Sequence, residues 1–392
     1  MRDEAFMRDG INIPAENWSA GWLTTYVDRP FLDRNALVNS FDYTFKRGKI
    51  YARGKFLISN INEKKKSKTG YGGYTTIEYR PSDNCLYYTE FTRYDDELDI
   101  NDMGYLRRNN LSEGVLYGEW QQTDFSEDSK IASVMWRGVI ILDRNNEGKS
   151  LHSGTNIYFV WNEKLKSGSD IELDITYSPS GYDDFISRGN GVVYLDDRVE
   201  DLLLSYSTQR RGMWRKSLSM RVFQEGYDDW AVSLKGSISL YPHEDLTIDL
   251  SLEPLWSRDW LIWMWGDRLA SFSRRKLSTD IVTNWFPAEK HEIRLRAQWL
   301  VIDADIEQAF RIGPDSRLVP SNDTINSFAA INFGLQLRYR YEIAPLSDFY
   351  LVYSRGGLDY IDNPDKSTLG LLGTSTSLRN SDQIMMKLRY RF

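Results

Sequence analysis

Along this chain, apolar and polar residues alternate in a succession of short segments. Apolar residues recur at every second position from Ile384 to Phe392, and Lys387, Arg389 and Arg391 lie between them. Such alternation predicts a β-strand with one apolar and one polar face. In a soluble sandwich the apolar face is covered by a second sheet. In a membrane barrel it contacts lipid, and the polar face lines a wet lumen.

The terminal segment also ends in a way that favours the barrel. Its last residue is aromatic, and a second aromatic residue lies two positions earlier on the same face; Leu388, Tyr390 and Phe392 form this terminal pattern. It resembles the signal by which bacterial outer-membrane barrels are recognised for insertion, and it implies the barrel-assembly machinery as a partner. An amphipathic edge strand of a sandwich can show the same pattern.

The same alternation predicts an antiparallel meander through most of the chain, with about 17 strands, or 18 with the first segment, and no helix. The predicted strands are 21–27, 41–45, 50–59, 74–80, 86–93, 115–121, 131–142, 156–161, 171–177, 202–207, 218–223, 230–241, 246–253, 269–285, 293–301, 332–342, 349–353 and 384–392. Residues 60–69 are predicted to form a loop.

Connections in the C-terminal third alternate between short and long. The short ones are Pro242–Asp245, Pro287–Lys290 and Ala344–Ser347, and the long ones are Asp303–Ser327 and Gly356–Asp382. Short turns on one rim and long loops on the other are typical of outer-membrane barrels. We therefore predict an all-β fold, an antiparallel transmembrane β-barrel of roughly 16 to 18 strands in the outer membrane of a Gram-negative bacterium.

Composition agrees with this prediction. The 392 residues include 24 Tyr, 17 Phe and 13 Trp, while the mean hydropathy is −0.51. Many aromatic residues suit interfacial girdles, and no apolar run approaches the ~18 to 20 residues of a membrane helix. A barrel combines both properties because its strands hide half of their residues from lipid.

The beginning of the chain has no basic-then-apolar export signal. We expect the sequence to be a C-terminal fragment of a longer protein, since the strand number is one short of even. Residues 1–33 are predicted as an N-terminal segment with room for one partial strand, and residues 34–392 as the barrel domain.

Several kinds of chemistry are disfavoured. A single cysteine, Cys85, allows neither an intramolecular disulfide nor a cysteine metal cluster. The net charge of −7, without a basic stripe, argues against nucleic acid as a partner. The chain has no glycine-rich phosphate loop and no nucleophile elbow. No cofactor is expected.

Three stretches carry a family resemblance: Asn101–Asn110, Leu335–Tyr341 and Asp348–Tyr353. Together they resemble the C-terminal barrel domain of a large bacterial family of unknown function. In that family a sugar-binding-like β-sandwich, similar to carbohydrate-binding module family 9, precedes the barrel. The resemblance implies fold and location but no activity. This sequence differs from the family pattern by lacking the sandwich domain.

Charged residues recur on the polar faces of the late strands. The predicted lumen-facing charges are Arg294, Arg296, Arg338, Arg340, Arg389 and Arg391, opposed by Asp249, Glu253, Glu292 and Glu342, with Asp170, Glu172 and Asp174 on an earlier strand. Opposed charges across a pore set its transverse field and ion preference. The alternative is a set of ion pairs that only keeps the wall ordered.

Two further clusters have both a functional and a structural interpretation. Trp256, Trp260, Trp263 and Trp265 form a predicted extracellular aromatic cluster, which suits either stacking on sugars or anchoring at the lipid interface. The acidic stretch from Asp95 to Asp102 offers hard oxygens for Ca²⁺, but it lacks the glycine and closing glutamate of a calcium loop. A solvated acidic loop is the alternative, and no metal site is predicted.

No catalytic residue is predicted. His152 and Ser153 invite comparison with barrel-embedded lipases, but adjacent strand residues point to opposite faces. We expect a non-enzymatic channel or uptake component that contacts outer-membrane lipid, with carbohydrate as a candidate cargo. One alternative is a plugged barrel that anchors a sugar-binding domain. The other is a soluble all-β glycan-active hydrolase, whose carboxylate pair the sequence alone does not identify.

Overall fold

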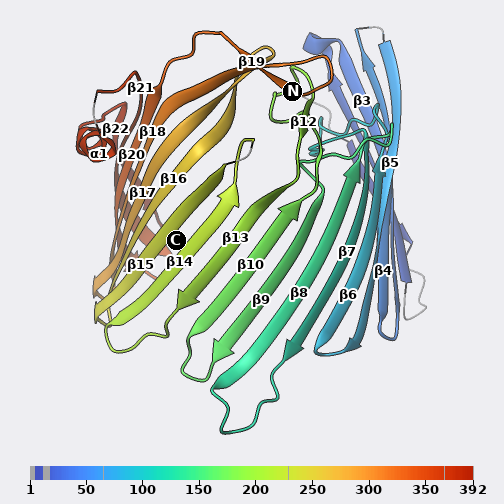
Figure 1. Ribbon diagram of the computed structural model, residues 1–392. Coiled ribbons are helices and arrows are strands. Elements are labelled where there is room, and N and C mark those ends of the chain that lie inside the picture. Colours follow the sequence, from blue (N-terminus) through green and yellow to red (C-terminus); the bar gives the residue numbers. More distant parts are fainter. Residues whose placement is uncertain (1–4, 12–17, 65, 228, 366, 392) are drawn as a thin grey trace.

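The structure, a computed structural model, describes residues 5–11, 18–64, 66–227, 229–365 and 367–391. It is one long antiparallel meander that bends into a wide, curved wall (Figure 1). Its elements are β1 (Ala5–Ile11), β2 (Trp18–Arg29), η1 (Pro30–Leu32), β3 (Arg34–Arg47), β4 (Ile50–Glu63), β5 (Lys66–Ser82), β6 (Cys85–Tyr94), β7 (Leu111–Gln122), β8 (Ile131–Arg144), β9 (Asn156–Leu165), β10 (Asp170–Ser178), β11 (Gly181–Asp183), β12 (Val193–Leu195), β13 (Arg198–Ser207), β14 (Trp214–Gln224), β15 (Trp230–His243), β16 (Leu246–Trp265), β17 (Arg268–Ala288), β18 (His291–Ile312), β19 (Leu318–Ser321), β20 (Phe328–Ala344), β21 (Ser347–Asp362), α1 (Thr368–Ser375) and β22 (Ser381–Arg389).

Twenty strands belong to a single sheet, and β11 and β12 form a separate two-stranded ribbon. Neighbours in the sheet follow chain order and are antiparallel. The short β19 pairs with the far end of β18, beyond the stretch that pairs with β20. The remaining nineteen of the twenty strands therefore lie side by side. Because each neighbour reverses direction, the two edge strands, β1 and β22, run the same way.

The predicted strands are all present, and the all-β antiparallel fold is confirmed. The structure adds β1 and β19, so the sheet exceeds the predicted strand number. Closure was expected, but within the described residues no pairing joins β1 to β22, and the sheet is open. The expected partial strand before residue 34 is the full-length β2, which pairs with β3 along its whole length.

Three regions predicted as loops contain regular structure. Strands β4 and β5 continue into residues 60–69, and β18 extends to Ile312 because an Arg311 to Val319 pairing with β19 supports its end. The last long connection contains α1, whose N-cap Ser367 accepts a hydrogen bond from the Gly370 N–H at 3.4 Å. Among the described residues, no helix is both long and apolar enough to span a membrane.

The register gives the wall one apolar and one polar face. Leu204 pairs with Leu173 on one side and Met220 on the other, while the adjacent Ser205 pairs with Glu172 and Ser219. Because strand residues alternate between faces, the first three share one face, the outer face, and the last three share the other, the inner face. The inner face is concave, and the connection between β6 and β7 folds onto it (Figure 1).

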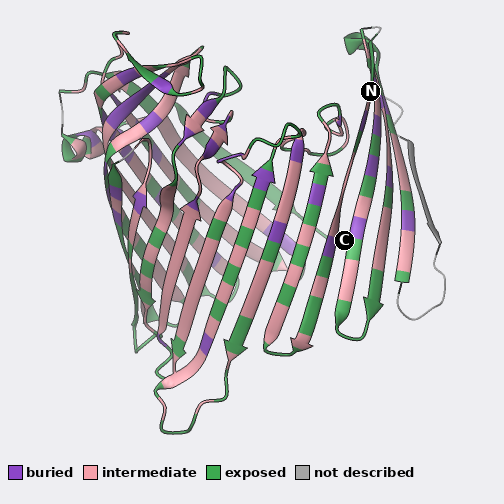
Figure 2. Ribbon diagram, turned by 45° about the vertical axis from the view of Figure 1, so that its right-hand side comes forward, coloured by how far each residue is buried: buried purple, intermediate pink, exposed green. Residues whose placement is uncertain are grey.

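The outer face exposes large apolar side chains along the wall. Buried residues instead gather near the rim of long connections, the long-loop rim (Figure 2). The exposed apolar side chains of the outer face include Phe41, Phe56, Ile77, Tyr87, Leu116, Trp136, Ile140, Leu204, Leu218, Met220, Leu252 and Leu337. Near the long-loop rim, Leu371 of α1 packs on Val301 and Ile331 of this face. Soluble monomers rarely expose contiguous apolar patches of more than a few hundred Å².

Candidate functional site: the inner face and its mouth

Near the rim of short turns, the inner face holds a carboxylate surrounded by arginines. Glu292 of β18 faces Arg340 of β20 in the register, and Arg294 faces Arg338. The Glu292 carboxylate accepts from Arg338 at 3.0 Å and from Arg340 at 3.4 Å, and it also pairs with Arg294. Its side chain is only 6% exposed. Arg340 additionally donates to Asp348 of β21 at 2.9 Å. Neighbouring strands thus share these ion pairs.

Other predicted lumen charges lie outside this arginine cluster. Arg296 is exposed on the inner face, and its guanidinium pairs with no carboxylate in the described part of the chain. Arg389 stands opposite Asp348 in the register, and the Arg391 N–H donates to Ser347 Oγ at 3.0 Å. Glu342 lies 4.0 Å from Arg340.

The two acidic residues predicted on β16 form separate local contacts. Asp249 accepts a hydrogen bond from Ser239 Oγ. Glu253 accepts from Ser233 Oγ at 3.3 Å and lies 3.6 Å from the Lys276 ammonium. These contacts join β15, β16 and β17 within the wall, so Asp249 and Glu253 do not join the arginine cluster.

Negative charge gathers on the inner face of β10. Asp170, Glu172 and Asp174 occupy alternate positions there. One carboxylate oxygen each of Asp170 and Asp174 is buried and has no hydrogen-bond partner within the described residues. Basic residues dominate the inner face of β18 and β20, and β18 is the sixth strand after β10 in the sheet. The wall thus separates its charges laterally, which gives its inner face an electric field.

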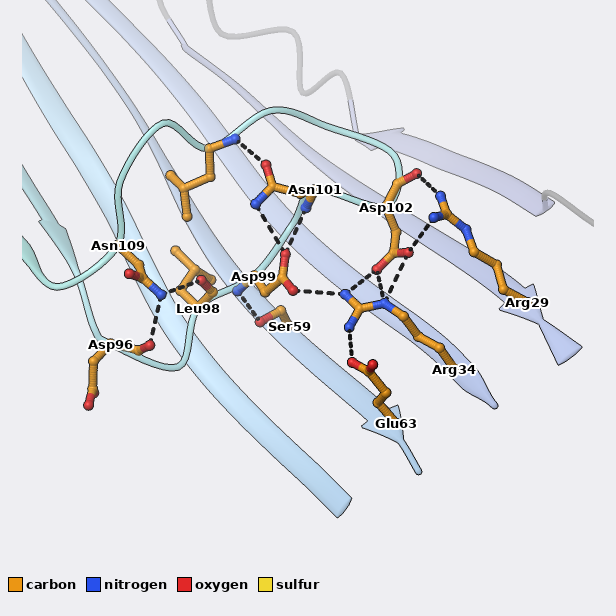
Figure 3. A network of polar contacts seen from close by, with 11 residues as sticks. Arg29, Arg34, Ser59, Glu63, Asp96, Leu98, Asp99, Asn101, Asp102 and Asn109 are labelled. Carbon is orange, nitrogen blue, oxygen red and sulfur yellow. Dashed lines mark hydrogen bonds and ion pairs between the residues drawn. The ribbon is translucent and has the colours of Figure 1, made fainter. Parts of the chain in front are cut away.

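At the long-loop rim, the connection from Asp95 to Asn110, the mouth loop, is held by one arginine (Figure 3). Arg34, the first residue of β3, donates to Asp102 at 2.6 and 3.0 Å, to Asp99 at 2.8 Å and to Glu63 at 2.8 Å. Arg29 lies 3.4 Å from the other Asp102 oxygen. The side chains of Arg34 and Asp102 are 16% and 4% exposed. The acidic loop is therefore docked, not freely solvated as the structural alternative supposed.

Backbone contacts complete the docking. Leu98 is 1% exposed, and the neighbouring Asp99 N–H donates to Ser59 Oγ of β4 at 3.1 Å. The Asp95 carboxylate accepts from the N–H groups of Tyr71 and Leu98 at 2.6 and 2.7 Å. Gly70 of β5 makes room for the loop, because a Cβ there would overlap the Leu98 backbone. Arg34, Ser59 and Gly70 were not identified from the sequence, because the loop residues that they contact lie far along the chain.

Between the mouth loop and the β4–β5 hairpin lies a cavity of about 600 Å³. Its cationic lining residues, besides Arg34, are Lys64, Lys66, Lys68, Arg107 and Arg108. Arg108 pairs with Asp184 and stacks on Phe185, with its guanidinium 4.2 Å from the ring centre. The mouth loop and the hairpin thus line the long-loop end of the inner face with polar, mainly basic side chains.

Docking of the mouth loop is expected to persist from neutral pH to about pH 5 and to fail in stronger acid. Burial alone would raise the pKa of Asp99, but the Asn101 N–H and the Arg34 guanidinium donate to its carboxylate and hold the pKa below its ordinary value of 3.8. A depressed pKa stabilises docking above the pKa of the free carboxyl and loses this contribution as pH falls through the docked-state pKa. Hydrogen exchange at Leu98 and Asp99 from pH 7 to pH 3, corrected for intrinsic rates, measures it. Release between pH 7 and pH 5 would contradict the expectation.

The four tryptophans predicted as one cluster are dispersed. A bulge between Ser257 and Trp260 shifts the register of β16 against β17. Trp256 stays exposed, whereas Trp260 packs against buried Phe272 and Phe328. Trp263 donates from Nε1 to the Gly266 carbonyl at 2.8 Å. Trp265 is also exposed, with the Arg268 guanidinium 5.6 Å from the ring centre.

His152 is 1% exposed, and its Nδ1 lies 2.8 Å from the Pro179 carbonyl oxygen. Its other ring nitrogen lies 3.5 Å from Glu200, a residue of β13. Those contacts tie the loop after β8 to the connection before β13. No group of three or more histidine, cysteine, aspartate or glutamate side chains among the described residues could hold a metal ion.

The terminal strand lies at the sheet edge. Leu388 and Tyr390 of the predicted insertion signal are 65% and 55% exposed, and Leu388 pairs with Phe349 in the register. Phe392 lies outside the described residues.

Comparisons with known proteins identify a family. The sequence matches the family described as Domain of unknown function (DUF5916) over residues 17–390. No curated protein matches it. Among solved structures, the crystal structure of BauA, the ferric preacinetobactin receptor from Acinetobacter baumannii, is similar with a TM-score of 0.36 and 6% sequence identity. That likeness covers 98% of this chain and 76% of the receptor chain.

Proposed function

The chain belongs to the DUF5916 family of domains of unknown function, and we propose that it forms a solute-conducting β-barrel wall in a bacterial outer membrane. The observation that carries this proposal is the outer face, which exposes apolar side chains on strands from β2 to β22. Water would penalise that surface by ~25 cal/mol for each Å². Lipid removes the penalty, and the side chains suit the lipid-facing band of outer-membrane barrels.

The inner face supports a path for water and solutes. It carries paired and unpaired charges that require hydration, and the acidic β10 lies apart from the arginine cluster of β18 and β20. Charged rings and patches of this kind determine ion preference in pores. We therefore assign to these side chains the roles of binding, positioning and charge selection, without a chemical step.

Single-channel conductance of the full chain, refolded into a planar bilayer, tests the proposal. Arg296→Glu is the informative variant, because Arg296 is exposed on the inner face and its change disturbs no ion pair among the described residues. We expect a shift in reversal potential towards cations. The outward-facing Leu295→Met should leave selectivity unchanged. Failure of the folded protein to enter bilayers would overturn the membrane assignment, and insertion without conducting steps would reject an open channel.

A plugged barrel that anchors a sugar-binding domain is the second candidate, and the docked mouth loop favours it. In that case the wild-type protein inserts without conducting, and release of the mouth loop opens the path. Carbohydrate as cargo is part of this proposal, since the cavity beside the loop offers charged and amide groups that hydrogen-bond hydroxyls. Saccharide-dependent current block of the loop-released protein would support it, and no block by any saccharide would count against it.

Outer-membrane lipid and the barrel-assembly machinery are the proposed partners. The machinery would recognise the terminal pattern of Leu388, Tyr390 and Phe392, of which the first two are exposed on the edge strand or directly after it.

A further inference from the structure

The outer face of β7 and β8 contains a gap in its row of apolar side chains. Gly118 and Gly138 are direct register partners and share this face with Trp120 and Trp136. Neither glycine has a positive φ. A Cβ at Gly138 would meet no atom within 4 Å, and one at Gly118 would meet only the Tyr87 ring, at 3.4 Å. Neither backbone conformation nor packing therefore requires glycine at these positions.

Glycine has a conformational cost inside a strand and contributes no side chain to pack. It often marks a place where a ligand or another backbone approaches closely. Two such residues side by side, on a face rich in large apolar side chains, leave a depression whose floor is backbone. Larger side chains at Gly118 and Gly138 would fill the depression without straining the backbone.

The depression is part of a groove of about 720 Å³ that crosses five strands, β5 to β9. Its walls are aliphatic and aromatic on both sides of the glycine pair. The outer-face residues that line it are Ile77, Tyr79, Tyr87, Thr89, Leu116, Ile140, Ile157 and Phe159.

The position of the groove indicates what it would contact. Trp120, Trp136 and Trp161 are register partners in one row, two residues nearer the short-turn rim than the glycines. Tryptophans gather near the headgroup level of membrane proteins, so a groove beside this row lies in the leaflet at the short-turn rim. Five strands span four spacings, or about 19 Å. At the usual tilt of about 45° this covers roughly 13 Å of depth, close to the ~15 Å of one leaflet.

We propose that this groove binds one acyl chain of a phospholipid in the leaflet at the short-turn rim, more tightly than the rest of the outer face binds lipid. The inference rests on the proposed membrane location. A chain lying on backbone between Leu116, Ile140 and the ring of Phe159 would contact the wall on three sides, whereas a chain on the flat outer face contacts one. The lining needs no polar partner from the ligand.

The test uses the full chain in phospholipid vesicles that contain a trace of phospholipid with a photoactivatable diazirine on one acyl chain. Peptide mass spectrometry after illumination locates the attached lipid. We expect labelling of β5 to β9 at least fivefold above that of other outer-face strands. Gly118→Leu with Gly138→Leu should remove this excess, and Gly138→Ala alone should reduce it in part. Gly114→Leu, which adds one leucine side chain to the same face of β7 outside the groove, is the control for Gly118→Leu.

These outcomes distinguish failure of the groove proposal from failure of the proposed membrane location. Equal labelling along all outer-face strands would overturn the groove as a specific site. Cross-links from the groove to a second copy or another protein, in place of lipid, would overturn the ligand class. Excess labelling that survives both leucine substitutions would also reject the assignment, provided that circular dichroism shows the folded state. Protein that does not float with the vesicles would instead refute the membrane location itself.

Discussion

Replacing Leu204 by arginine is expected to destabilise the membrane-inserted protein by up to about 2–4 kcal/mol, the cost of a basic residue on the lipid face at the bilayer midplane. Leu204 lies on the outer face and is 53% exposed, and its register partners Leu173 and Met220 are apolar. The guanidinium would have no carboxylate beside it on that face. Denaturant titration of the protein folded in vesicles, with reversibility established, gives the free energy of unfolding.

The adjacent Ser205→Arg is the matched control. It introduces the same charge one residue away on the inner face, where Glu172 is its register partner. We expect a change within about 0.5 kcal/mol, as for ordinary exposed positions. Equal costs for both variants would contradict the assignment of the two faces. A larger cost for Ser205→Arg would reverse it.

Replacement of Arg34 by methionine is expected to release the mouth loop. Removing one partner of a largely buried ion pair typically costs about 3–5 kcal/mol, because the remaining charge stays buried without compensation. Here Asp102 would be that charge, with a side chain 4% exposed. The loss favours the undocked loop by on the order of 100-fold or more. Limited proteolysis between residues 95 and 110 and amide exchange at Leu98 measure the release.

Two further variants separate charge from shape. Asp102→Asn in the Arg34→Met background removes the uncompensated charge and should restore part of the docking. Gly70→Leu, which changes no charge, should release the loop because its side chain overlaps the backbone of Leu98. If Arg34→Met leaves proteolysis and exchange unchanged, the ion pairs are not what holds the loop. Conductance that rises in both releasing variants would identify the mouth loop as an obstruction.

Most of the wall was predictable from the sequence because alternation is a local property. Residues 171–177 and 332–342 show it without interruption, and both are strands. The pattern fails where a strand is covered on both faces. Beyond Val301, the buried Asp303 and Ala304 follow one another, and β18 continues although the alternation has ended. Likewise, the bulge after Ser257 disperses the tryptophans, and no residue type announces it.

The site was less predictable, because its contacts join distant parts of the chain. The acidic residues of the mouth loop were recognised, but their partner Arg34 lies 65 residues before Asp99. Alternation placed Glu292 and Arg340 on polar faces, yet only the register of β18 and β20 brings them together. The glycine pair also depends on register, since Gly118 and Gly138 become neighbours only when β7 and β8 pair.

The shared direction of the two edge strands limits how the wall can become a cylinder. If β22 met β1, the seam would be the one parallel junction in an antiparallel sheet, and bacterial single-chain barrels are built from even, antiparallel sets. Strand β2 runs opposite to β22, so it can offer an antiparallel seam once β1 gives up its seven residue pairs with it. Lipid tolerates no unsatisfied backbone edge, and it therefore favours any exchange that seals one. In the proposed membrane location, this preference would favour β2 over β1 as the partner of β22 at the closing seam.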